Sequence, residues 1–569
     1  MGNFYKDNKD IENVIDALDL TEVATLLEED FKFAKEYDFA PKDAADAIDN
    51  YKRAIDICGD VMANRIAPLA EETDAVGSVL NADGSVTYAP GIKLALELFG
   101  KTGLLGVQIP YYLGGLNMPC TVLTACNDIV SRGDASLMNI FGLQGIADTI
   151  NMFGDEEMKK TYIPKLVTGE WTGAMVLTEP DAGSDLQSVK TTAYQDADGN
   201  WFVNGVKRFI TNGCGEVLLV LARTEKGTTD GRGLSCLLVE KGPWVKVRRL
   251  ENKLGIHGSP TCELVYKNAK AELCGMRKMG LIKYVMALMN GARLGIAAQS
   301  VGISQAAYNE GLAYARDREQ FGKKIITLPA VADMLSLMKA KLDAGRALLY
   351  QCARYVDVYK ALDDIARERK LTPEERTEQK TYAKLADSLT PLAKGMNSEY
   401  CNQNTFDALQ IHGGSGFMMD YPIQRYYRDA RITNIYEGTT QLQVVAAIRY
   451  VTNGSYLAQM REFEQAEVSE AVKPLQAQAK ALADLFEQAV EHVKEAQSQE
   501  MQDLCARHLV EMAADVIMLH LLCYNATQQP EMFEKSARVY ARFVTAEVQK
   551  HHTWVMDMTA EALADYRCE

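Results

Sequence analysis

Residues 171–185 read WTGAMVLTEPDAGSD, and this stretch decides how the centre of the chain folds. GAMVLT is a short apolar run of the kind that forms β-strands. Directly after it, Pro180 and Gly183 predict a loop. Such a loop exposes backbone N–H groups together with the hydroxyls of Thr178 and Ser184, and these groups suit a phosphorylated ligand. We therefore expect a binding loop at the end of a strand, with a purely structural turn as the alternative.

Further strands are expected on the C-terminal side of this loop, as far as about Leu273. The runs are rich in Val, Leu, Thr and aromatic residues and are bounded by turn residues: DADGNWFVNGVKRFITNG, VLLVLART, LSCLLVEK and CELVYK. The pair Asn204-Gly205 predicts a tight hairpin turn, because both central positions of that turn need positive φ. We assign residues 166–275 to a β domain.

Helical spacing flanks the β domain on both sides, with apolar residues recurring at three and four. We expect an N-terminal helical domain over residues 1–165, a helical bundle over 276–453 and a C-terminal helical extension over 454–569. The fold class is therefore mainly α with a central β domain.

Two details of the helical part follow from the same pattern. The charged stretch 363–380 contains Pro373 and predicts a solvated connection between two long helices. In the extension, one helix face is apolar and is expected to be buried. Its residues are Leu475, Ala479, Leu482, Phe486, Ala489 and Val493.

The composition is that of an ordinary globular protein, with 47% hydrophobic and 24% charged residues. A net charge of -16 disfavours nucleic acid as a partner, because such binding needs a basic surface. The start has no apolar signal-peptide core, and no window approaches the roughly 20 unbroken apolar residues of a membrane-spanning helix. Twelve cysteines without a CxxC pair indicate free thiols in a reducing compartment. We expect a cytoplasmic protein with no transmembrane segment.

Several common chemistries lack their sequence spacing. A GxxxxGK[ST] phosphate loop ending at Thr102 would need glycine where Ala95 stands. The glycine-rich HGGSGF at 412–417 has no strand-turn-helix context of a dinucleotide fold, and no GxSxG motif occurs. The seven histidines show no metal-ligand spacing, so no metal is expected.

Four segments together resemble the acyl-CoA dehydrogenase family. In chain order they are TEPDAGSD at 178–185, FITNG at 209–213, REQFGK at 318–323 and YEGTTQ at 436–441, and QIHGG precedes the last at 410–414. The resemblance covers about residues 40–450, and the extended helical tail suggests the long subgroup of the family. It implies a β-barrel-like middle domain, a four-helix-bundle domain and FAD as the cofactor.

The resemblance also implies which residues contact FAD. Thr178 would hydrogen-bond the isoalloxazine ring, and Arg318 would reach the pyrophosphate of the FAD in a neighbouring subunit. Phe209 stands where the family usually has Trp, and with Thr211 it would support the flat ring, because alternate residues of a strand share a face. The full set is Met175, Thr178, Ser184, Phe209, Thr211, Arg318, Gln320, Gln410, Gly413, Gly414, Thr439 and Gln441.

Glu437 is the residue that the resemblance identifies as the catalytic base. A carboxylate moved into an apolar pocket becomes a stronger base, which suits removal of the α-proton of a thioester. The backbone N–H of Glu437 would help to polarise the thioester carbonyl, while hydride passes from the β-carbon to flavin N5 and a trans-2-enoyl-CoA forms. Some family members carry the base on an earlier helix, but the matching NGAR at 290–293 has no carboxylate. Substrate contacts are implied for Ser184, Asn290, Arg293 and Gly438.

Three functions compete at this stage. The first is a dehydrogenase of fatty-acyl β-oxidation that passes electrons to an electron-transfer flavoprotein. The second is an acyl-CoA oxidase that uses dioxygen, and the third is a non-enzymatic helical assembly factor on the same fold. For the first, we expect a homodimer in which the tail packs on the central bundle, because an amphipathic face must be buried against something.

Overall fold

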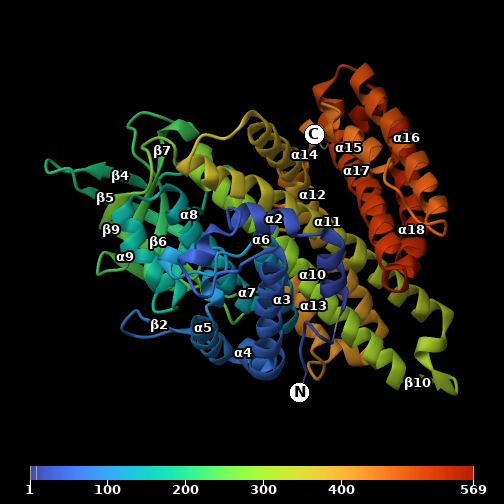
Figure 1. The fold of residues 1–569 in the computed structure, drawn as a ribbon, viewed down its shortest axis with the longest axis horizontal. Helices are drawn as coiled ribbons and strands as arrows, with labels where there is room; N and C mark the ends of the chain where they lie inside the picture. Colours follow the sequence, from blue (N-terminus) through green and yellow to red (C-terminus); the bar gives the residue numbers. More distant parts are fainter. Residues whose placement is uncertain (1, 8, 568–569) are drawn as a thin grey trace. The chain divides into compact units, whose positions relative to one another are not determined.

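The computed structural model describes residues 2–7 and 9–567, which are arranged in two compact units (Figure 1). The first unit consists of Met1–Asp7 and Phe33–Gly295, and the second of Asn8–Lys32 and Ile296–Glu569. The long helix α10 (Met286–Asp317) contains the point of division.

Helices make up the N-terminal part of the first unit, as expected. Aspartate N-caps define where several of them begin: the side chains of Asp43, Asp134 and Asp155 accept hydrogen bonds from backbone N–H groups of the first turn of α3, α7 and α9. The helices are α3 (Ala44–Val61), α4 (Ala70–Val76), α5 (Pro90–Thr102), α6 (Cys120–Gly133), α7 (Ala135–Phe141), α8 (Gly145–Phe153) and α9 (Glu156–Val167), and a short hairpin of β1 (Val79–Leu80) and β2 (Val86–Thr87) interrupts them.

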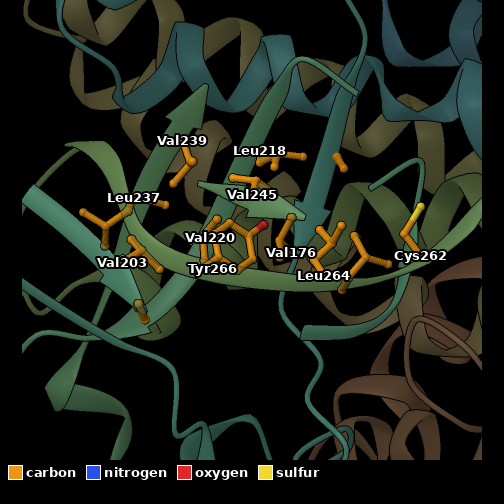
Figure 2. Packing of buried hydrophobic residues seen from close by; sticks show 14 of the residues in the cluster. Val176, Val203, Leu218, Val220, Leu237, Val239, Val245, Cys262, Leu264 and Tyr266 are labelled. Atoms are coloured by element: carbon orange, nitrogen blue, oxygen red, sulfur yellow. The ribbon is translucent and has the colours of Figure 1, made fainter. Parts of the chain in front are cut away.

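A seven-stranded sheet forms the rest of the first unit, in the order β3-β6-β4-β5-β9-β7, with β8 paired to β9. Because β7 also pairs with β6, the sheet curls back on itself, which confirms the barrel-like β domain. Figure 2 shows Val176, Val220 and Leu264 among the side chains that fill its interior. The strands are β3 (Gly173–Val176), β4 (Thr192–Gln195), β5 (Trp201–Thr211), β6 (Val217–Arg223), β7 (Leu234–Glu240), β8 (Val245–Leu250) and β9 (Thr261–Leu273).

The predicted hairpin turn at Asn204-Gly205 is wrong. Both residues lie inside β5, and the turn between β4 and β5 is at residues 196–200, where Gly199 has positive φ. Glycine at position 205 instead allows Thr191 to approach the backbone closely, because a Cβ here would collide with Thr191. The ladder to β9 also shifts register between Val203 and Gly205, which marks an irregularity that glycine accommodates.

The second unit is helical. The connection between the two longest helices is shorter than predicted: α11 ends at Glu368 and α12 begins at Pro373, so only residues 369–372 connect them. A capping box formed by Thr372 and Glu375 starts α12, with Pro373 at a favoured first position. The elements are α1 (Lys9–Leu18), α2 (Thr21–Leu27), α10, β10 (Glu319–Gln320), β11 (Lys323–Lys324), α11 (Pro329–Glu368), α12 (Pro373–Ile411), α13 (Ile423–Ala430), α14 (Thr440–Thr452), α15 (Ser455–Phe463), α16 (Lys473–Glu495), α17 (Gln499–Gln528) and α18 (Pro530–Met556).

Ion pairs join the N-terminal helices α1 and α2 to α11 within this unit. The carboxylate of Asp10 lies 3.1 Å from the ammonium of Lys339 and 3.4 Å from the guanidinium of Arg346. Glu22 lies 2.7 Å from Arg354 in the same way. Asn8–Lys32 therefore groups with the helices that follow Gly295 in the chain.

The C-terminal extension packs on the bundle helices, as predicted. Figure 1 shows α16, α17 and α18 side by side, and α17 and α18 contact α11. The Tyr400 hydroxyl of α12 donates to Asp515 of α17 at 2.9 Å, and the Ser536 hydroxyl of α18 donates to Asp343 of α11 at 2.6 Å. The expected buried face of α16 is confirmed at Ala479, Leu482, Phe486, Ala489 and Val493, while Leu475 is half-buried.

Two helices of the described chain are long and apolar enough to cross a membrane by length and composition alone, Gly280–Asp317 and Gln499–Gln528. In the second, 89% of the most apolar window is buried inside the protein, which is typical of a core helix. The eleven cysteines within residues 2–7 and 9–567 are free and buried, which confirms that prediction for this part of the chain.

The buried carboxyl of Asp515 predicts a pH dependence of stability. Burial raises its pKa from an ordinary 3.8 to about 7, although the hydrogen bond from Tyr400 works in the opposite direction. The folded chain therefore binds this proton more tightly than the unfolded chain, and its stability falls as the pH rises from about 4 to about 7. Asp515→Asn keeps an acceptor for Tyr400 and should remove this contribution.

Thermal unfolding at pH 6 and pH 8, both above the sequence pI of about 5.1, measures the effect. Between these values wild-type protein should lose roughly 1 kcal/mol more stability than Asp515→Asn. Asp503→Asn, exposed on the same helix, should follow the wild type. An equal loss in all three proteins would show that Asp515 does not titrate in this range.

Candidate functional site

A buried ion pair holds the loop that follows β3. Glu179 is 6% exposed, and its carboxylate lies 3.0 Å from the ammonium of Lys207, which is fully buried. The same carboxylate accepts backbone N–H groups from Lys190 at 2.7 Å and from Thr191 at 2.9 Å. Burial by itself would raise the pKa of Glu179, but the charge of Lys207 and these hydrogen bonds outweigh it and lower the pKa. Glu179 of the TEPDAGSD motif therefore anchors the loop structurally.

The main chain around Thr178 is fixed by β5. The Lys207 ammonium donates to the carbonyl of Leu177 at 2.7 Å, and the backbone N–H of Arg208 donates to the carbonyl of Thr178 at 2.9 Å. Burial lowers the pKa of Lys207 to about 8, with the charge of Glu179 opposing the change. The Thr178 side chain is half-buried and Ser184 is exposed, so the loop presents both hydroxyls from a rigid base.

Phe209 occupies a strained position in β5. Its φ is +61°, and the ladder to β9 shifts register between Lys207 and Ile210. The bulge turns the Phe209 ring outward, where it is 53% exposed and carries the Arg208 guanidinium 4.6 Å from its centroid. Ile210 is buried, whereas Thr211 is half-buried. Strained backbone at a bulge gives this apolar ring an outward direction that regular strand geometry would not provide.

The other predicted residues of the first unit lie on β3 and α10. Met175 is half-buried on β3. On α10, the Arg293 guanidinium donates to the side-chain oxygen of Asn290 at 3.3 Å. Arg293 is buried and Asn290 is half-buried, so this pair is a fixed polar group in an otherwise apolar helix turn.

In the second unit, a hairpin presents the residues of the REQFGK motif. Arg318 follows the end of α10, and β10 and β11 pair across Phe321 and Gly322, both with positive φ. Phe321 is 90% exposed, and Arg318 and Gln320 are exposed as well. A two-residue turn of this kind projects its side chains away from the bundle.

The QIHGG segment ends α12. Gln410 is exposed on the last turn of the helix, and Gly413 and Gly414 are exposed in the turn after it. His412 is buried, with its ring stacked on Tyr314 at a centroid distance of 4.3 Å. A Cβ added at either glycine would meet nothing within 4 Å, so the backbone here is open to a ligand.

Glu437 lies in a tight turn before α14. Its φ is +52° and that of Gly438 is +88°, so both residues adopt the left-handed conformation. The Gln443 amide donates to the carbonyls of Glu437 at 3.3 Å and Gly438 at 3.0 Å. The Lys394 ammonium of α12 donates to the same Gly438 carbonyl at 2.5 Å. Side chains from two helices therefore fix the turn that carries the predicted base.

The side chains on either side of Glu437 are also held in place. The Tyr436 hydroxyl donates to Gln299 of α10, and burial together with the charge of Glu437 raises the pKa of Tyr436. On the other side, Thr439 caps α14 by accepting the N–H of Leu442. Gln441 is exposed on the first turn of that helix.

The sequence-predicted residues thus fall into two sets. Met175, Thr178, Ser184, Phe209, Thr211, Asn290 and Arg293 belong to the first unit, and Arg318, Gln320, Gln410, Gly413, Gly414, Glu437, Gly438, Thr439 and Gln441 belong to the second. Sequence reasoning missed Lys207, Lys394 and Gln443, which act on main-chain carbonyls next to these residues. A lysine within the small and apolar run LTPLAKGM was the available signal for Lys394.

Comparison with known families finds matches along most of the chain. Profiles described as acyl-CoA dehydrogenase N-terminal domain, middle domain and C-terminal domain match residues 51–170, 174–269 and 282–450. A further profile, acyl-CoA dehydrogenase C terminal, matches residues 452–563.

The chain is also similar to individual proteins. A 3-methylmercaptopropionyl-CoA dehydrogenase of Ruegeria pomeroyi is 36% identical over 70% of this chain and 69% of its own length. An acryloyl-CoA reductase (NADH) of Anaerotignum propionicum is 36% identical over 68% of this chain and 90% of its own length. The structure of an acyl-CoA dehydrogenase complexed with FAD from Bacillus anthracis matches with a TM-score of 0.76 over 91% of this chain and 90% of its own chain. At 24% sequence identity, this match shows similarity of fold.

The chain belongs to the acyl-CoA dehydrogenase family. It is an oxidoreductase that acts on acyl-CoA, and its fold is the one that the resemblance implied.

The buried pair under the first loop yields a stability prediction. Lys207→Met leaves the Glu179 carboxylate buried without its counter-charge, which should destabilise the first unit by about 3–5 kcal/mol. Lys190→Met is the matched control, because its side chain is exposed and only its backbone N–H contacts Glu179. It should change stability by less than about 0.5 kcal/mol. Thermal unfolding of the two variants compares them, and equal melting temperatures would contradict the anchoring role.

Proposed function

We propose that the chain catalyses FAD-dependent α,β-dehydrogenation of an acyl-CoA thioester to the trans-2-enoyl-CoA, with Glu437 as the base that removes the α-proton. The observation that carries the proposal is the turn at Glu437. Glu437 is half-buried on left-handed backbone, and Gln443 and Lys394 hold the carbonyl that follows it, so the fold fixes the backbone from which its carboxylate projects. It stands at the position where the family motif YEGTTQ has its base.

The residues present fit FAD. In the first unit, the rigid loop at Thr178 and the outward ring of Phe209 offer a polar edge and an apolar face for a flat ring. In the second unit, the open backbone at Gly413 and Gly414 and the exposed Arg318 suit a pyrophosphate. When bound, FAD supplies the acceptor for the hydride that leaves the substrate β-carbon.

The chain's own groups have separate tasks in this proposal. Glu437 takes the α-proton, and its backbone N–H stabilises the negative charge that develops on the thioester oxygen. Arg293 and Ser184 are the proposed contacts to the CoA thioester, with Asn290 orienting Arg293 through its side-chain oxygen. Gly438 allows the acyl group to approach the backbone closely.

For the electrons, we infer an electron-transfer flavoprotein as the acceptor, as the family resemblance implies. One relative of this chain is named acryloyl-CoA reductase (NADH), a name that describes the reverse reaction, reduction of an enoyl-CoA. Peroxide measured with air as the sole electron acceptor distinguishes a dehydrogenase from an oxidase. An oxidase forms peroxide in proportion to turnover. A protein that binds FAD but is not reduced by any acyl-CoA would instead support the assembly-factor alternative.

The remaining assignments are proposals of the same kind. They are a cytoplasmic homodimer, in which Arg318 of one subunit reaches the FAD of the other, and a role in fatty-acid β-oxidation. The exposed hairpin tip at Arg318 and Phe321 supports the homodimer, because the 90% exposed ring of Phe321 favours burial against a partner subunit.

Glu437→Gln should strongly slow flavin reduction while keeping FAD and substrate binding, because the amide keeps the shape of the carboxylate but cannot accept the α-proton. Anaerobic mixing with butyryl-, octanoyl- or palmitoyl-CoA, followed by flavin absorbance, gives the rate. We expect a fall of at least roughly 10²–10⁴-fold, the range of general-base catalysis. Glu374→Gln, exposed at the start of α12, should react as the wild type does. Near-normal reduction in Glu437→Gln would show that the base lies elsewhere.

A further inference from the structure

We propose that Lys394 and Gln443 are positioning residues for the catalytic base: they hold the Gly438 carbonyl and so fix the left-handed turn from which the Glu437 side chain projects. The inference rests on the proposed role of Glu437 as base. It adds two residues that lie outside the motif YEGTTQ, Lys394 on α12 and Gln443 on α14, and it requires neither of them to contact the substrate.

The geometry that supports the inference converges on one oxygen atom. The Gly438 carbonyl accepts the Lys394 ammonium at 2.5 Å and the Gln443 amide at 3.0 Å. The Gln443 amide also reaches the Glu437 carbonyl at 3.3 Å. Lys394 is fully buried and Gln443 is 2% exposed, so both donor side chains are shielded from water. A charge-assisted hydrogen bond in such a setting is stronger and more directional than a neutral one.

The turn requires such support because its conformation is unfavourable. A non-glycine residue with positive φ costs of order 1–3 kcal/mol and persists only where the surroundings over-determine it. Glu437 has φ of +52°, and no helix or strand includes residues 431–439. The polar side chains that contact the carbonyls of Glu437 and Gly438 therefore take the place of regular backbone hydrogen bonding.

A second set of contacts steadies the ends of the same turn. Glu399 lies on α12, and its carboxylate accepts the Thr440 hydroxyl at 2.5 Å and the Asn434 amide at 3.2 Å. Helix α12 thus holds the segment 434–440 at both ends and, through Lys394, in the middle. The position of the turn is consequently fixed relative to helix α12.

The expected consequence is kinetic rather than structural. A displacement of about 1 Å in a catalytic group lowers a rate by up to roughly 100-fold. Loss of one of the two donors should shift the turn without removing it from the bundle. Proton abstraction should therefore slow, while FAD content and acyl-CoA binding stay as they are.

Lys394→Met tests this with a side chain of similar length and no donor. Flavin reduction by the best of butyryl-, octanoyl- and palmitoyl-CoA should slow roughly 10–100-fold. The kinetic isotope effect with the same acyl-CoA deuterated at the α-carbon should increase, because proton abstraction becomes more rate-limiting. Gln443→Met should show the same two changes, and the double variant should be less affected than the product of the single effects, because both residues act on one carbonyl.

Lys341→Met is the matched control. Lys341 is also a buried lysine of the second unit, but its ammonium donates to Gln403 on α12 and not to the turn. It should lose stability without an increase in the isotope effect. If Lys394→Met does not fold, Gln443→Met alone carries the test.

The outcomes are distinguishable from failure of the proposed function. If Glu437→Gln blocks flavin reduction but neither Lys394→Met nor Gln443→Met changes the rate and isotope effect beyond Lys341→Met, the positioning role is refuted and Glu437 remains the base. If Glu437→Gln itself reduces flavin normally, both ideas fail. A slowed rate with an increased isotope effect in both variants supports the inference.

Discussion

The hydrogen bond from a buried lysine ammonium to a main-chain carbonyl is the interaction on which the candidate site residues of each unit depend. In the first unit Lys207 reaches the carbonyl of Leu177, directly before Thr178. In the second unit Lys394 reaches the carbonyl of Gly438, directly after Glu437. Burying an ammonium costs desolvation free energy unless an oxygen accepts its hydrogen bonds. The carbonyl that accepts the bond is therefore held in place, and the loop is fixed with it.

Strained backbone occurs at three of the candidate segments. Phe209, Phe321 and Glu437 are non-glycine residues with positive φ, and each stands within a segment that resembles a family motif. Neighbouring elements hold each strained residue: β5 carries Phe209 at a bulge, a hairpin carries Phe321, and side chains from α12 and α14 support the turn at Glu437. Such positions give a side chain a direction that ordinary strand or helix geometry does not provide.

Local patterns predicted most of the architecture, because strands and helices leave periodic apolar signals. They failed where a long-range contact decides the conformation. Asn204-Gly205 has the composition of a hairpin turn, yet pairing with neighbouring strands and the close approach of Thr191 place it inside β5. The motifs gave the candidate site residues, whereas the partners of Lys207 and Lys394 could not be predicted. Spacing along the chain does not state which distant carbonyl a buried ammonium will meet.

The central claim is that the turn at Glu437 delivers a base to the α-carbon of an acyl-CoA. Exchange of the α-proton with solvent tests it most directly, because exchange reports proton abstraction apart from the electron acceptor. FAD-loaded enzyme is incubated anaerobically with acyl-CoA in deuterium oxide, and the recovered thioester is analysed by mass spectrometry. The account predicts deuterium at the α-carbon with wild-type enzyme and none above background with Glu437→Gln. Equal incorporation by both proteins would contradict it.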